Sequence, residues 1–113
     1  MTDKAKQGRA NRRKGNAYES AVVAWLKTHV WPYAERRGGG FASADIIGTP
    51  GVSIEIKNQQ TISLPGWFRQ AEEQAAAGPD GTVPLLVIKR KGHADVGESY
   101  AVMRLADLAP LID

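Results

Sequence analysis

The sequence predicts a single α/β domain built around a mixed sheet. Its 113 residues suit one domain, and 42% hydrophobic with 24% charged residues is an ordinary globular composition. Helical and strand patterns alternate along the chain in the order α-β-β-β-α-β-β-α. No apolar run approaches the roughly 20 residues that a membrane helix needs, and the first residues lack the apolar stretch of a secretory signal. We therefore expect a cytoplasmic protein that does not cross or bind a membrane.

The first predicted helix runs from Asn16 to about His29. Asn16 is a good N-cap, and Glu19 three residues later completes a capping box. The helix should end before Pro32, because proline disfavours helical geometry in the residue that precedes it. Apolar residues recur at helical spacing at Tyr18, Ala21, Val22, Trp25 and Leu26. We expect this face, Trp25 included, to enter the core.

Three strands should follow this helix, over residues 31–37, 45–47 and 52–57. The third alternates most clearly: Val52, Ile54 and Ile56 point one way, and Ser53, Glu55 and Lys57 point the other. After them we expect a helix over residues 65–77, strands over 83–88 and 100–103, and a short helix over 105–111. The unbroken apolar run Leu85-Leu86-Val87-Ile88 favours a strand that is covered on both faces.

Composition and charge narrow the function classes. The chain has no cysteine, which excludes a disulfide framework, a thiol nucleophile and a cysteine zinc site. The formal net charge is +3, but residues 1–14 hold six basic residues against Asp3, so this segment carries +5 and the remainder −2. We therefore divide the chain into a basic flexible arm, 1–14, and a folded domain, 15–113. A basic arm on a nearly neutral body favours a polyanionic partner.

Two acidic residues stand where packing alone would not demand them. Asp45 opens a strand that is otherwise apolar, and Glu55 shares one strand face with Lys57. A hairpin between the two strands would bring the three side chains together. A two-residue Pro50-Gly51 loop would place Asp45 and Glu55 on opposite faces, so we expect a longer turn or a bulge. Two carboxylates are suitable ligands for Mg²⁺ at a phosphodiester, and Lys57 would add a cation beside the reacting phosphate.

The alternative interpretation of the Glu-x-Lys pattern is an exposed strand face in water, as most charged side chains are. Glu19 also has two interpretations. It completes the capping box, yet it lies on the same helical arc as Val23 and Leu26, which favours a role in the site.

Asp45 followed by Glu55-Ile56-Lys57 on the next strand resembles the signature of the PD-(D/E)xK nucleases. The first helix, with Arg13-Lys14-Gly15-Asn16-Ala17-Tyr18-Glu19, resembles the opening helix of archaeal-type and phage Holliday junction resolvases. The chain departs from the nominal motif in having Ala44 where proline precedes the aspartate. The resemblance covers roughly residues 12–90 and implies a restriction-endonuclease-like αβββαβ core.

What the resemblance implies is a Mg²⁺-dependent endodeoxyribonuclease, with Mn²⁺ able to substitute, encoded by a bacterium or a phage and acting inside the cell. Asp45, Glu55, Glu19 and the carbonyl of Ile56 would bind the metal, and Lys57 would stabilise the transition state. Branched DNA such as a four-way junction would be the substrate, and a homodimer would cut its two strands. Other PD-(D/E)xK nucleases of nicking, repair or restriction type, and a non-catalytic DNA-binding module, remain alternatives. An RNA-directed enzyme is a third.

The remaining candidates lie in loops and on the second helix. Gln70 resembles an active-site orienter of related nucleases, or it belongs to a partly exposed polar stripe with Gln74. Ser43 is a candidate phosphate contact or an ordinary loop residue, and His93 has no assigned role. The residues expected to hold phosphates are Arg9, Arg12, Arg13, Lys14, Arg36, Arg37, Ser43, Lys89, Arg90 and Lys91.

Overall fold

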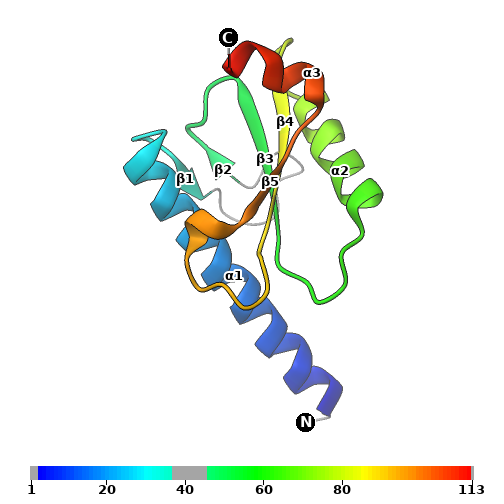
Figure 1. Ribbon diagram of the computed structural model, residues 1–113. Helices are drawn as coiled ribbons and strands as arrows, with labels where there is room; N and C mark the ends of the chain where they lie inside the picture. The colour runs from blue at the N-terminus through cyan, green and yellow to red at the C-terminus, as the bar shows by residue number, and fades with distance from the viewer. Residues whose placement is uncertain (1–2, 37–45, 113) are drawn as a thin grey trace.

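In the computed structural model, which describes residues 3–36 and 46–112, helices and strands follow one another in the predicted order (Figure 1). Side chains are described from residue 15 onward. The elements are α1 (Asp3–His29), β1 (Glu35–Arg36), β2 (Ile46–Ile47), β3 (Val52–Lys57), α2 (Leu64–Ala76), β4 (Val83–Ile88), a 3-10 helix η1 (Val96–Glu98), β5 (Tyr100–Val102), α3 (Leu105–Leu108) and a 3-10 helix η2 (Ala109–Leu111). The chain is therefore an α/β domain with a mixed sheet.

The main sheet has the strand order β3-β4-β5. β3 and β4 are parallel, with Val52 opposite Val83 and Lys57 opposite Ile88, and α2 forms the crossover between them. β5 closes the sheet antiparallel to β4, with Leu86 opposite Val102. Because β3 and β4 are parallel, both reach their carboxyl ends at the same edge of the sheet.

The two long helices cover opposite faces of this sheet (Figure 1). On one face α1 packs against β3 and β4, and its Val22 and Leu26 share a core with Ile54, which is fully buried. On the other face α2 contributes Trp67, which packs with Leu86 and Ile88. β4 thus buries side chains on both faces, as its unbroken apolar run predicts.

The first helix is longer than predicted. It begins at Asp3 instead of Asn16, so Asn16 lies inside the helix and the capping-box interpretation of Glu19 is wrong. The basic segment expected to be an arm without regular structure is helical from Asp3, and it extends past the sheet (Figure 1). Trp25, expected in the core, keeps 36% of its surface exposed.

The prediction that β2 and β3 pair as a hairpin is wrong for the described residues. β2 is antiparallel to β1, with Glu35 opposite Ile47, and no ladder joins β2 to β3 in the described part of the chain. The turn between them contains Gly48 and Gly51 at φ 79° and 80°, values that favour glycine. Within residues 3–36 and 46–112, no helix is long and apolar enough to cross a membrane.

Candidate active site

The polar face of β3 is buried, although charged side chains of this kind are usually exposed. Glu55 retains 6% of its surface, and its Oε1 lies 3.4 Å from Nζ of Lys57. The side chain of Lys57 is 18% exposed, and its ammonium lies 6.0 Å from the centre of the Trp67 ring. The burial follows from the crossover, because α2 packs across this face. Buried charges cost solvation free energy, so an ion pair in this layer is poorly explained by stability alone.

Beside this ion pair lies a cavity of about 300 Å³, lined by Glu55, Lys57, Gln70, Glu73 and Gln74. The structure therefore brings Gln70 to the same place as Glu55 and Lys57, as the sequence predicts. Glu73 was not among the predicted site residues. The sequence could have indicated Glu73, because it follows Gln70 by three positions and residues with that spacing share one face of a helix.

Gln74, which the sequence placed in a polar stripe with Gln70 without a defined role, also lines this cavity. Its Oε1 is buried and makes no hydrogen bond within the residues that the structure describes. A buried amide oxygen without a donor is uncommon and costs free energy. Glu73 and Gln74 thus add a carboxylate and a buried amide to the α2 side of the cavity.

The carbonyl of Ile56 points away from β4. In the parallel ladder the amide of Val83 donates to the oxygen of Gly51, and the amide of Lys89 donates to the oxygen of Lys57. Because carbonyls alternate along a strand, the carbonyl oxygens of the odd-numbered residues of β3 point sideways to β4, and the carbonyl oxygen of Ile56 points to the other side of β3. β2 lies on that other side, since its residues contact β3. Asp45 immediately precedes β2 but falls outside the described residues.

On its β3 side, the described part of the cavity offers one carboxylate as a hard metal ligand, that of Glu55. No group of three or more His, Cys, Asp or Glu side chains capable of holding a metal occurs within residues 3–36 and 46–112. Mg²⁺ keeps several waters and is commonly bound through one or two carboxylates together with substrate phosphates. Glu55 offers such a carboxylate at the cavity wall. Asp45 would be the second, and its position relative to Glu55 is not described.

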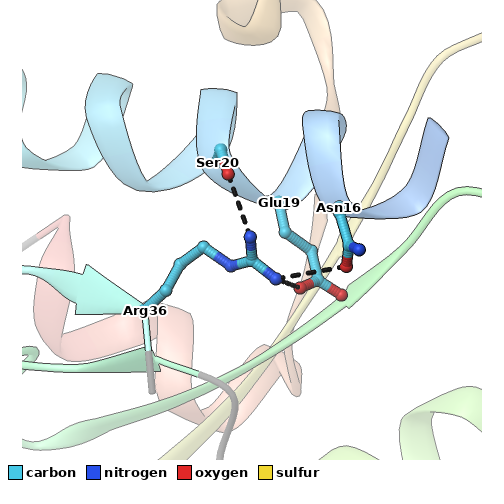
Figure 2. Close-up of polar contacts among 4 residues, drawn as sticks. All are labelled: Asn16, Glu19, Ser20 and Arg36. Carbon is cyan, nitrogen blue, oxygen red and sulfur yellow. Dashed lines mark hydrogen bonds and ion pairs between the residues drawn. The ribbon is translucent and has the colours of Figure 1, made fainter. Parts of the chain in front are cut away.

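Glu19 lies on the other face of the sheet, on α1, and its carboxylate binds Arg36 of β1 (Figure 2). Nη2 of Arg36 donates to Oε2 of Glu19 at 2.9 Å and to Oδ1 of Asn16 at 3.3 Å, while Nη1 donates to Oγ of Ser20 at 3.0 Å. The guanidinium therefore joins β1 to α1. The Glu19 carboxylate already has a cationic partner, and nothing in the described residues brings it to the Glu55 cavity.

The predicted phosphate contacts are distributed unevenly. The guanidinium of Arg36 hydrogen-bonds to side chains of α1. Nη1 of Arg90 lies 3.5 Å from Oε2 of Glu98, and the Arg90 guanidinium lies over the Tyr100 ring. Lys89 and Lys91 are exposed in the loop after β4. Arg37 and Ser43 lie outside the described residues, and for four residues only the helical backbone is described: Arg9, Arg12, Arg13 and Lys14.

Comparison of the chain with protein-family models, with curated proteins and with solved structures finds no match. The functional argument therefore depends on the residues and their arrangement.

Proposed function

We propose that this chain is a metal-dependent endodeoxyribonuclease of the PD-(D/E)xK type that cuts branched DNA. The observation that carries the proposal is the buried Glu55–Lys57 pair beside a polar cavity, in a layer otherwise closed by Trp67 and the apolar face of β4. Retaining a carboxylate and an ammonium there costs solvation free energy, and a catalytic role accounts for that cost. The carboxylate would serve as a hard ligand next to a scissile phosphate.

Three residues of the cavity, together with Asp45 and Ile56, have a chemical task in this proposal. Glu55 and Asp45 would hold Mg²⁺, with the Ile56 carbonyl as a further ligand. A metal held there would supply an acidified water and offset charge that builds on the phosphate during attack. Lys57 is held beside Glu55 at 3.4 Å, close enough to orient the attacking water or to contact a phosphate oxygen. Gln70 hydrogen-bonds the nucleophile or the substrate from the α2 side of the cavity.

The substrate class follows from the charge distribution and the resemblance. The basic N-terminal half of α1 extends past the sheet at the edge where β3 and β4 end (Figure 1). Phosphate contacts of this kind position DNA without reading its sequence. A four-way junction presents two strands to be cut, and the described part of each chain holds one candidate active site. A twofold homodimer is therefore the assembly we propose.

The test is a nicking assay on four-way junctions and on linear duplex of the same sequence, with Mg²⁺, with Mn²⁺ and with EDTA. Wild type is compared with Glu55→Gln, and with Glu72→Gln as a matched control. Glu72 is also on α2, but it pairs with Arg104 at 3.7 Å and does not line the Glu55 cavity. We expect junction cleavage by wild type and Glu72→Gln in Mg²⁺, and none by Glu55→Gln or in EDTA.

Binding separates catalysis from folding in this experiment. Glu55→Gln and Asp45→Asn remove a negative charge near phosphate, so both should bind junctions as tightly as wild type or more tightly. Equal background nicking by wild type and Glu55→Gln would refute the enzyme, and junction binding without cleavage would favour the non-catalytic DNA-binding module. Equal cleavage of duplex and junction would refute the structure-selective assignment and retain a nuclease of another kind.

A further inference from the structure

A second polar pocket lies between α1 and the loop that follows β4. It has a volume of about 220 Å³, and its polar lining comes from four segments: Tyr18 on α1, Asn58 after β3, Lys89 and His93 after β4, and Ser99 before β5. This pocket shares no residue with the Glu55 cavity.

The two polar sites are back to back at one edge of the sheet. The amide of Lys89 donates to the oxygen of Lys57 at 3.0 Å, so the parallel pairing continues one residue beyond β3 and β4. Side chains alternate along a strand, so Lys57 faces α2 whereas Asn58 and Lys89 face α1. Grooves at the carboxyl ends of parallel strands are a common place for ligands in α/β proteins.

The pocket is rich in hydrogen-bond donors. The phenol of Tyr18 donates to Oγ of Ser99 at 2.7 Å, which leaves the Ser99 hydroxyl proton available to a ligand. Burial raises the pKa of Tyr18 although the hydrogen bond to Ser99 lowers it, so the phenol stays neutral and adds no negative charge. The side-chain amide of Asn58 brings two further donors and the ammonium of Lys89 brings three.

One carboxylate, Asp95, also lines the pocket. Its Oδ1 accepts a hydrogen bond from the amide of Gly97 at 2.9 Å, as the N-cap of η1. That oxygen is therefore held by the protein, whereas the carboxylate keeps its negative charge, which the ammonium of Lys89 in the same lining offsets.

We propose that this pocket binds a DNA backbone phosphate that flanks the scissile one. The inference rests on the proposed nuclease function and deepens it, because it assigns a path to the substrate strand. The strand crosses the edge formed by the ends of β3 and β4, with one phosphate at the Glu55 cavity and a neighbouring phosphate held by Asn58, Lys89 and Ser99. The basic half of α1 extends from the same edge and raises the local concentration of phosphates (Figure 1).

The experiment uses four-way junctions that each carry one neutral methylphosphonate linkage, moved one position at a time around the branch. Equilibrium binding is measured in EDTA for wild type, Lys89→Ala, Asn58→Ala and Lys91→Ala. Lys91 is the matched control, because it is an exposed lysine of the same loop that does not line the pocket. Circular dichroism confirms that each variant is folded.

We expect one flanking linkage at which neutralisation weakens wild-type binding about tenfold. In Lys89→Ala and Asn58→Ala that linkage should no longer matter, because the group that sensed its charge is gone. Lys91→Ala should retain the positional effect, even if its overall affinity falls. Should Asn58→Ala fail to fold, Lys89→Ala decides alone, since an exposed lysine is not needed for the core.

A positional effect that persists unchanged in Lys89→Ala would overturn the inference. The inference would also be overturned if the pocket bound only free phosphate. In that case inorganic phosphate would shift the amide resonances of Lys89 and His93, but no linkage of the junction would be sensitive to neutralisation. The two proposals fail separately. If wild type shows no sensitive linkage while its cleavage still depends on Glu55, only the flanking site is removed. If cleavage does not depend on Glu55 while wild type shows a sensitive linkage that Lys89→Ala abolishes, only the nuclease is removed.

Discussion

Replacing Arg36 with alanine tests whether Glu19 has a structural or a catalytic role. Arg36 makes three hydrogen bonds to α1, including the ion pair with Glu19 at 2.9 Å. The two side chains are 37% and 25% exposed, so water screens the pair, and exposed pairs contribute up to about 1 kcal/mol. We expect Arg36→Ala to lower the free energy of unfolding by about 1 kcal/mol, which corresponds to a fall in Tm of about 4 °C for a domain of this size.

The assay is a double-mutant cycle of Arg36→Ala and Glu19→Gln, with both Tm and junction cleavage measured. If Glu19 serves only to hold Arg36, Arg36→Ala lowers Tm at least as much as Glu19→Gln, because it removes all three hydrogen bonds. The double variant should then fall little below Arg36→Ala, because the ion pair is already lost in that variant. Cleavage at 25 °C, where all variants are folded, should then be nearly unchanged. A catalytic Glu19 would instead make Glu19→Gln lose cleavage at least tenfold more than Arg36→Ala.

The stability argument is refuted if Arg36→Ala leaves Tm unchanged. In that case the contacts drawn in Figure 2 contribute nothing measurable, as is true of many surface ion pairs. The catalytic hypothesis for Glu19 is refuted if Glu19→Gln and Arg36→Ala cleave equally well. The two results are independent, since one is read from unfolding and the other from turnover.

Three further changes test local features of the fold. Gly48→Ala should destabilise by about 2 kcal/mol or more, because its φ is 79° and an added Cβ would overlap the carbonyl of Tyr33; Gly51→Ala has a similar φ but open space, so a smaller loss of Tm is expected. Gly15→Ala should raise helicity by circular dichroism and stabilise by about 0.5 kcal/mol, because no neighbour crowds this position of α1. Gly15→Pro should lower both helicity and stability, because proline inside a helix lacks the amide hydrogen and clashes with the preceding turn. The raised pKa of Tyr18 contributes stability that is present below about pH 10 and lost as the pH rises through the folded value, so denaturation of Tyr18→Phe should show a weaker alkaline dependence than wild type.

The parts of the fold that were predictable are those with a local pattern. β4 coincides with its predicted bounds, 83–88, because an unbroken apolar run in a strand requires cover on both faces. The structure provides that cover, with Val87 packed toward α1 and Leu86 toward α2. The alternation of residues 52–57 likewise places Ile54 and Ile56 in the core, as predicted.

What the sequence did not reveal depends on tertiary contacts. Burial of Glu55 is a consequence of α2 crossing its face, which no pattern within β3 encodes. The N-terminal residues of α1 have no apolar periodicity, yet Ala, Lys, Arg and Gln are good helix formers and extend a helix that packs from Tyr18 onward. Arg36 was predicted to meet phosphate, and only the fold brings it beside Glu19.

The parallel pairing of β3 and β4 explains why two polar sites occur at one edge of so small a domain. Consecutive residues of a strand face opposite sides, so Lys57 and Asn58 belong to different faces although they are neighbours in sequence. The parallel neighbour repeats this alternation, with Ile88 facing α2 and Lys89 facing α1. Under the two proposals made above, successive phosphates of one DNA strand meet these opposite faces in turn. If the neighbour of β3 were antiparallel, it would begin where β3 ends. The residues before that neighbour would then have to complete the pocket in place of Lys89, which follows β4 in the parallel arrangement.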